Sequence, residues 1–151
     1  MTVINGQQLL RDKPIVNMET SKKRLHGVSY GLAEAGYDIR VKQDLYFDIN
    51  KRFMLASTIE EFNMPSYLVG VVHDKSTWAR QGLSVLNTII EPGWKGFLTL
   101  ELVYHGDKSL IIKAGSGIAQ VLFHETFNDA IYSGKYQNQE DRPIQSIWEL
   151  E

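Results

Sequence analysis

The chain has 151 residues, and its 16 basic and 18 acidic side chains give a formal net charge of −2 at pH 7. This length corresponds to about one domain, and the near-neutral charge gives no global reason to expect a nucleic-acid polymer as partner. The sequence contains no cysteine, which excludes a disulfide framework, a thiol nucleophile and the cysteine-containing zinc sites of nucleobase deaminases. No helical metal-binding pair is visible, and only a site assembled over long range stays open for the four histidines, His26, His73, His105 and His124.

The N-terminal residues show neither the basic segment nor the apolar stretch of a secretory signal. No apolar run approaches the roughly 18 residues that a membrane span requires. We therefore expect a cytoplasmic protein that does not contact a membrane.

Short β-type runs separated by turn residues predict a mostly β domain over residues 1–132. Their spacing of roughly 8–12 residues is typical of sandwiches and barrels. Two short helices are expected, near residues 5–11 and 76–81. The expected strands cover residues 37–41, 45–49, 53–58, 67–72, 83–88, 97–103, 109–113 and 118–124.

The C-terminal tail, residues 133–151, differs in kind. It begins with a polar, glycine-containing stretch, and an apolar group follows Pro143. One alternative is a frayed terminus. The other is a segment that docks its apolar end and closes over a site, and Trp148 favours this second alternative because a bare terminus has little use for it.

The strand expected over residues 97–103 carries a single carboxylate. Alternation places the leucines at 98, 100 and 102 on the core face and Glu101 on the opposite face. On an open surface Glu101 is a solvated charge, which alternation alone favours. In a cleft it is desolvated, and its pKa rises toward a range useful for acid/base chemistry.

A similar choice applies to Gln120, an amide within the apolar run over residues 118–124. An amide carries two donors and an acceptor. It either finds buried backbone partners or reads the edge of a base, and the sequence leaves both alternatives open.

Residues 75–82 combine two cations with a predicted helix start. Ser76 is a suitable N-cap, and Gly82 is suited to the position after the helix. Ser76 and Arg80 share one face, and Lys75 precedes the cap. This is either a polyphosphate cradle or a capped surface helix with solvated charges. It is not a Walker loop, because the glycine spacing is missing.

A series of short segments, in this order, resembles the dCTP deaminase branch of the trimeric deoxyuridine triphosphatase (dUTPase-like) superfamily. The segments are SYGL (29–32), AGYDIR (35–40), KSTWAR (75–80), IEPGWKG (90–96), LTLEL (98–102), GIAQ (117–120) and GKYQNQ (134–139). The resemblance implies a distorted jelly-roll or β-clip barrel with one or two short helices. It also implies a homotrimer with sites at subunit interfaces, a deoxynucleoside triphosphate ligand with Mg²⁺ on its phosphates, no zinc, and dTTP as a candidate regulator.

The resemblance also assigns roles to matched positions. Glu101 matches the general acid/base for water attack at C4 of cytosine, and Ser76 and Arg80 join it as catalytic residues. The positions that match the triphosphate-binding motif are Lys75, Ser76, Thr77 and Arg80. The base site comprises Thr99, Leu100 and Glu101, and Glu91 lies near the sugar. Further nucleotide contacts are implied for Gln120, Tyr132, Lys135 and Gln139.

The function that follows from the resemblance is zinc-independent deamination of dCTP to dUTP and ammonia. The alternative is a dUTP diphosphatase, which forms dUMP and pyrophosphate, or a bifunctional enzyme. A third hypothesis, from a different class, is a non-catalytic protein that binds nucleotides on the same scaffold.

Overall fold

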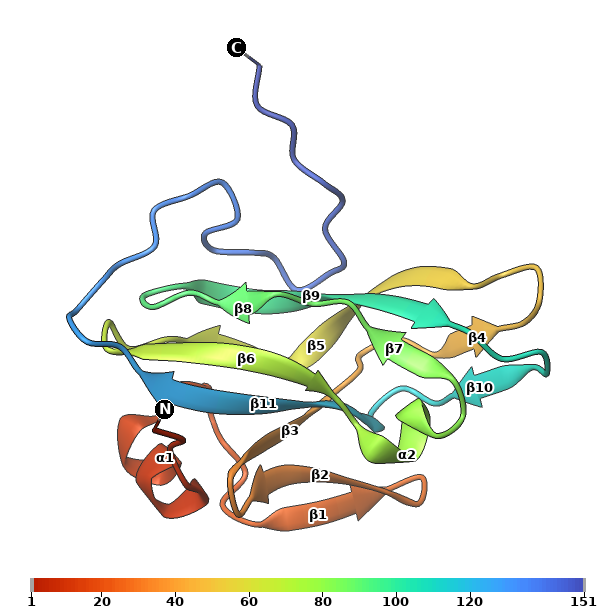
Figure 1. The fold of residues 1–151 in the computed structure, drawn as a ribbon, viewed down its shortest axis with the longest axis horizontal. Coiled ribbons are helices and arrows are strands. Elements are labelled where there is room, and N and C mark those ends of the chain that lie inside the picture. Colours follow the sequence, from red (N-terminus) through yellow and green to blue (C-terminus); the bar gives the residue numbers. More distant parts are fainter. Residues whose placement is uncertain (1, 151) are drawn as a thin grey trace.

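The computed structural model describes residues 2–150, which form a mostly β domain with an extended C-terminal tail (Figure 1). Two short helices accompany the strands. The elements are α1 (Gly6–Asp12), β1 (Lys22–Leu25), β2 (Val28–Ala33), β3 (Gly36–Arg40), β4 (Leu45–Phe47), β5 (Phe53–Asn63), β6 (Leu68–Asp74), α2 (Ser76–Ala79), β7 (Leu83–Val85), β8 (Ile89–Ile90), β9 (Lys95–Tyr104), β10 (Leu110–Ile112) and β11 (Gly117–Glu125).

The strands of residues 2–150 form three sheets that enclose one core. The largest sheet has six strands in the order β1-β2-β3-β11-β6-β8, a second has the order β5-β9-β7, and β10 pairs with β4. In Figure 1, β9 lies above β6 and β11. Fully buried side chains such as Phe47, Phe62, Leu100 and Phe123 fill the interior. Their burial removes apolar surface from water and stabilises the layered arrangement.

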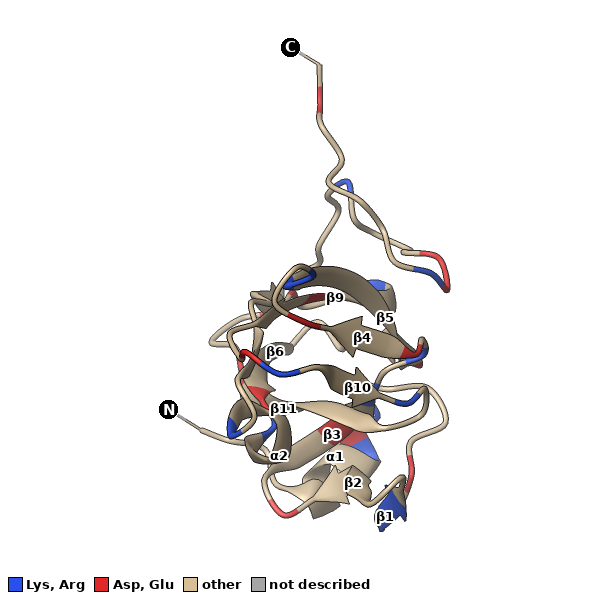
Figure 2. Cartoon of the chain, turned by 90° about the vertical axis from the view of Figure 1, so that its right-hand side faces the viewer, with Lys and Arg blue, Asp and Glu red and all other residues tan. Residues whose placement is uncertain are grey.

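The predicted mostly β fold is confirmed, and each predicted strand and helix lies at an observed element. The β1–β2 hairpin was missed. β1 is exposed along its whole length and basic, as Figure 2 shows, so it carries no apolar alternation. The hairpin turn that joins β1 to β2 consists of His26 and Gly27. Both residues have positive φ, as a two-residue turn of type I′ requires.

The strand predicted over residues 83–88 is two elements. β7 ends at Val85 on the edge of β9, and β8 pairs with β6 in the other sheet. The intervening residues carry the chain from one sheet to the other. A single apolar run therefore did not reveal the change of sheet, because both ends of it are equally strand-like.

The first helix, α1, begins as its sequence predicts. The side chain of Asn5 accepts a hydrogen bond from the backbone N–H of Gln8 at 3.0 Å, and Leu9 is fully buried beneath the helix. This cap satisfies one of the free N–H groups at the helix start. Neither helix within residues 2–150 has the length and apolar character of a membrane-crossing helix.

Candidate active site

A cleft of about 590 Å³ opens beside β9. One wall is the strand pair β5–β9, a second is the crossover from β7 to β8, and the tail forms a third. Its polar lining comes from residues distant in sequence, among them Asn87, Glu91, Thr99, Glu101, Tyr132 and Gln139. Apolar side chains share the lining with these polar groups, and a concave site of this kind is suited to a small molecule.

Glu101 lies in this cleft and is half-buried on β9, directly across from Leu55 on β5. Burial raises the pKa of its carboxyl above the ordinary value, and burial is the sole cause of this shift. Loss of hydration penalises the charged form of an acid, so the neutral form gains. Of the two alternatives for Glu101, the structure shows the desolvated one.

The first half of the tail is attached to β9. Gln139 forms a parallel bridge with Gly96, and the backbone N–H of Phe97 donates to the Gln139 carbonyl at 3.1 Å. Farther along, the Ile144 N–H donates to Thr99 Oγ1 at 3.0 Å. This path places Tyr136, Gln139 and Ile144 against the cleft.

The end of the tail behaves differently. Trp148 is 87% exposed, and Leu150 is 99% exposed. Figure 1 shows this end of the chain running away from the sheets. Within one chain the tail therefore docks only in part: Ile144 lines the cleft, whereas Trp148 and Leu150 are exposed, and closure of the tail over a ligand stays a prediction.

The segment around α2 was predicted to begin with Ser76 as the N-cap, and this detail is wrong. The N-cap is Lys75, which has an extended backbone and whose carbonyl accepts from the N–H groups of Trp78 and Ala79 at 3.0 and 2.9 Å. Ser76 is the first helical residue, and no side chain caps the helix. Trp78 anchors α2 to the domain, since its Nε1 donates to the Gly117 carbonyl at 2.7 Å.

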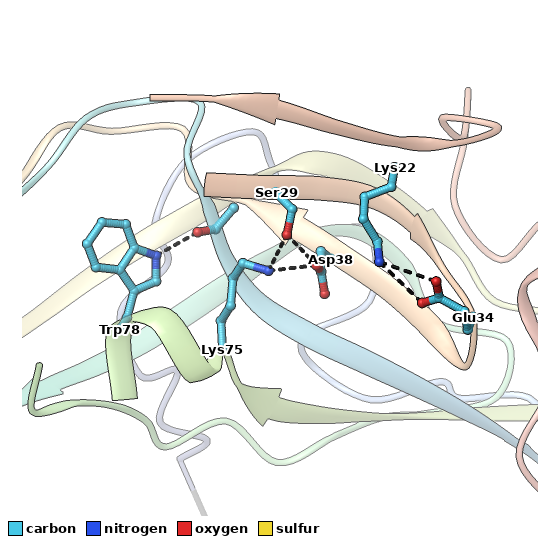
Figure 3. Close-up of polar contacts among 7 residues, drawn as sticks. Lys22, Ser29, Glu34, Asp38, Lys75 and Trp78 are labelled. Carbon is cyan, nitrogen blue, oxygen red and sulfur yellow. Dashed lines mark hydrogen bonds and ion pairs between the residues drawn. The ribbon is translucent and has the colours of Figure 1, made fainter. Parts of the chain in front are cut away.

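Lys75 is turned toward the domain interior (Figure 3). Its Nζ lies 2.6 Å from Asp38 Oδ2 and 3.0 Å from Ser29 Oγ. The side chains of Lys75 and Asp38 are only 10% and 9% exposed. A buried cation requires such a partner, and the ion pair fixes α2 against β3. Ser76, Thr77 and Arg80 are exposed beside it.

The structure thus divides the predicted site residues into two groups within one chain. Glu91, Thr99, Glu101, Tyr132 and Gln139 line the cleft. The α2 residues do not line it, and the same holds for two further positions. Gln120 pairs in register with Asp38 and His73, and Lys135 is exposed, its Nζ lying 5.5 Å from the centre of the Tyr136 ring. Leu100 has its side chain in the core, so only its backbone is available to a ligand.

A family model described as dCTP deaminase-like matches residues 38–126. The chain belongs to the dCTP deaminase-like family. This match includes α2, Glu91 and the strand with Glu101, whereas Tyr132, Lys135 and Gln139 lie outside it.

Relatives of this dCTP deaminase-like chain carry the same name. The dCTP deaminase of Herpetosiphon aurantiacus is 36% identical over 145 residues, which cover 74% of this chain and 79% of the relative. That of Campylobacter jejuni is 35% identical over 147 residues, with 74% and 78% covered. The matches identify an enzyme of this kind.

Solved structures similar to this dCTP deaminase-like chain are dUTPases. EIAV dUTPase has a TM-score of 0.56 at 21% identity, covering 76% of this chain and 90% of its own. The dUTPase of Staphylococcus bacteriophage 80alpha has a TM-score of 0.57 at 16% identity, with 76% and 88% covered. A dUTPase from phage phi11 of S. aureus, with a TM-score of 0.57, 15% identity and coverage of 76% and 88%, was solved for its structural Mg(II) ion. The predicted dUTPase-like fold is confirmed.

Three residues of the cleft and its surroundings escaped the sequence analysis. Asn87 and Tyr136 line the cleft, and Asp38 holds Lys75. Asp38 and Tyr136 lie inside quoted segments but were given no role. Asn87 lies in the crossover between sheets, and nothing in its neighbourhood distinguishes it from any loop asparagine.

Proposed function

We propose that this protein hydrolyses dCTP to dUTP and ammonia, with Glu101 as the general acid/base. The observation that carries the proposal is the position of Glu101, a half-buried carboxylate whose pKa is raised by burial, in a cleft large enough for a nucleoside. A carboxylate with a raised pKa is a better proton acceptor than an ordinary one and can still return the proton. The family match and the relatives' names support the same reaction.

The reaction needs proton transfers at three places. Glu101 takes a proton from water as the water oxygen bonds to C4 of cytosine, and it passes that proton to ring N3. It then moves the proton of the new C4 hydroxyl to the amino group, the C4–N4 bond breaks, the C4 carbonyl forms and ammonia leaves. Water and dCTP are thereby converted into dUTP and ammonia. A positioned general acid/base contributes typically 10²–10⁴-fold to such a rate.

The cleft supplies groups for the rest of the nucleoside. Thr99 and the backbone of Leu100 lie along the strand that carries Glu101, where the base is proposed to bind. Glu91 is proposed beside the sugar. Tyr132, just before the tail, and Gln139 in the tail also line the cleft, and they would hold the nucleotide from the opposite side.

The triphosphate is proposed to bind at the start of α2. Ser76, Thr77 and Arg80 are exposed there, and the Lys75 ammonium lies behind them. This group does not line the Glu101 cleft of the same chain. We therefore propose a homotrimer in which the α2 region of one subunit completes the cleft of another. Ser76 would also orient the water or the base, and Gln120 and Lys135 would contact the nucleotide from their separate positions.

We propose that the metal ion of the reaction is Mg²⁺ bound to the phosphates of the substrate. The chain has no cysteine, and residues 2–150 hold no cluster of three or more His, Asp or Glu side chains that would suit a metal ion. This donor set supports a zinc-independent route. Mg²⁺ favours phosphate oxygens with several waters over an all-protein cage, so we propose that it arrives with the triphosphate.

A second activity is favoured by one specific observation, namely that Glu91 lines the same cleft as Glu101. A carboxylate near the sugar can activate water for attack on the α-phosphorus of dUTP, which releases dUMP and pyrophosphate. Such an enzyme is a dUTP diphosphatase, and with both carboxylates active it would be bifunctional. The dUTPase-like fold is consistent with this chemistry.

One experiment tests both activities. The purified protein with Mg²⁺ is incubated separately with dCTP and with dUTP, and ammonia and pyrophosphate are measured. Ammonia from dCTP without pyrophosphate identifies the deaminase, and pyrophosphate from dUTP identifies the diphosphatase. If nucleotide binds but neither product forms, the catalytic proposal is wrong and the protein is a nucleotide-binding module.

A further inference from the structure

We infer that Asn87 is a positioning residue for Glu101, holding the catalytic segment of β9 in place and excluding water from its edge. Asn87 Nδ2 donates to the Thr99 carbonyl at 2.7 Å, and Asn87 Oδ1 accepts from the Glu101 N–H at 2.9 Å. One side-chain amide thus binds the backbone on both sides of Leu100. This inference rests on the proposed role of Glu101.

The reason that β9 needs such a residue lies in its neighbour. β7 pairs with β9 from Leu83 to Val85, and the N–H of Leu86 still donates to the Glu101 carbonyl at 2.8 Å. The chain then leaves this sheet for β8. In a regular ladder the Glu101 N–H would donate to a strand carbonyl, but here the amide of Asn87 takes that place.

The replacement of a strand partner by the Asn87 amide also shapes the cleft. Because the chain leaves the edge of β9 after Leu86, space opens beside Glu101, and Asn87 and Thr88 line that space. Without the amide, the Thr99 carbonyl and the Glu101 N–H would be free to bind water. Backbone N–H and C=O groups that are removed from bulk water nearly always have a hydrogen-bond partner, and here the Asn87 side chain is that partner. Asn87 therefore allows a cleft at this edge while the strand stays rigid.

The surroundings of Glu101 make water exclusion chemically significant. The titratable groups that line its cleft are Glu91 from the turn before β9, Tyr132 just before the tail, and Tyr136 in the tail. No lysine, arginine or histidine lines the cleft within residues 2–150. With no cation there, partial burial of the carboxyl is what favours its neutral form, and in this inference Asn87 helps to keep water from this edge.

A matched control exists in the same sheet. Gln43 Nε2 donates to Ser57 Oγ at 2.8 Å, and Gln43 Oε1 accepts from the Ser57 N–H at 2.8 Å. Gln43 therefore binds β5 through two amide hydrogen bonds, as Asn87 binds β9, and it does not line the cleft. Asn87→Ala and Gln43→Ala remove the same kind of contact, and only the first removes it beside Glu101.

The test uses two readouts on the full-length protein. The first is the pKa of the Glu101 carboxyl, followed by NMR with ¹³C-labelled glutamate and assigned with Glu101→Gln. We expect Asn87→Ala to lower it toward the ordinary value and Gln43→Ala to leave it unchanged. The second is dCTP deamination, where Asn87→Ala should lower kcat by about 10- to 100-fold with little change in KM, the size expected of a misplaced catalytic group.

Asn87→Asp serves as the second variant and covers the case in which the alanine variant does not fold. It keeps an acceptor for the Glu101 N–H and adds a carboxylate to the cleft, so the pKa of Glu101 should rise. A Glu101 pKa and kcat that stay at wild-type values in the folded variants, with only the melting temperature lowered as in Gln43→Ala, would overturn the inference. If the wild type releases no ammonia from dCTP, the proposed function fails, whereas the titration still decides the role of Asn87.

Discussion

Two carboxylates of this protein are withdrawn from bulk water in opposite electrostatic surroundings. Asp38 is held by the Lys75 ammonium at 2.6 Å and by Ser29. Glu101 lies in a cleft whose lining, within residues 2–150, offers it no cation. The first carboxylate is compensated and serves as an anchor for α2. The second is not compensated, and burial therefore raises its pKa.

The difference shows how one chain separates binding from proton transfer. A buried charge with a partner is costly to disturb, so the α2 corner is suited to holding a fixed set of phosphate-binding groups. A buried carboxylate without a partner exchanges its proton easily, so the cleft is suited to acid/base chemistry. The proposed reaction needs both, and the two regions lie at different places in the fold (Figure 1).

The largest expected effect comes from removing the uncompensated carboxylate. Glu101→Gln keeps the size of the side chain but cannot accept the proton of the attacking water. The rate of deamination should therefore fall by about 10²–10⁴-fold. Calorimetric titration with dCTP should show that binding is retained. Glu125→Gln, at the exposed end of β11, is the control and should keep full activity. Undiminished ammonia release by Glu101→Gln would show that the proton passes elsewhere.

A mixing experiment tests whether the two regions meet between subunits. Arg80→Ala and Glu101→Gln should each be inactive alone. In trimers mixed at random from equal amounts of the two variants, a site is intact when the subunit that supplies Arg80 and the subunit that supplies Glu101 each carry the unaltered residue. Each condition holds for half of the subunits, so about one quarter of the wild-type activity is expected. Ammonia release is measured after refolding the two variants together. No recovery, with subunit mixing verified by mass spectrometry, would place both groups in one chain's site.

The compensated carboxylate should affect stability more than chemistry. Asp38→Asn leaves the Lys75 ammonium buried without its charge partner, which typically costs about 3 kcal/mol or more of unfolding free energy. Urea unfolding measures the loss. The double variant Asp38→Asn/Lys75→Met should regain part of it, since no buried charge remains. A loss below about 1 kcal/mol would mean that the Lys75 side chain escapes to solvent and that the pair does not hold α2.

The sequence predicted the parts of this arrangement that are local. Strand alternation placed Glu101 on the face opposite the buried Leu100 and Leu102, although Leu98, predicted on the same core face, is only partly buried and lines the cleft. Turn residues marked the ends of most strands. The same local logic missed β1, whose exposed basic residues show no period, and it assigned the cap of α2 to Ser76 rather than Lys75. An N-cap depends on backbone conformation, and side-chain preference alone did not identify it.

The parts that escaped prediction depend on contacts between distant segments. Glu101 faces a cleft rather than open solvent because two distant segments lie beside it. These are the crossover between sheets at Asn87 and the tail, which begins about 30 to 40 residues after Glu101. The partner of Lys75 lies 37 residues before it. Alternation gives the direction of a side chain but not what faces it, and only the tertiary fold supplies that information.

The smallest effect concerns the stability of the folded protein as a function of pH. Because the pKa of Glu101 is higher in the folded than in the unfolded chain, the folded state holds its proton more tightly. Stability therefore falls as the pH rises from the unfolded pKa, about 4.3, through the higher folded value. Glu101→Gln lacks this titration, so its stability relative to wild type should increase across that window and then level off.

Thermal unfolding of both proteins over this pH range measures the difference, with Glu125→Gln as the control for general loss of negative charge. Glu125 lies at the exposed end of β11, so this control variant is expected to follow the wild type. A difference between Glu101→Gln and wild type that stays constant with pH would mean that Glu101 has the same pKa in both states. The cleft would then not desolvate it, and the contrast with the compensated Asp38 would disappear.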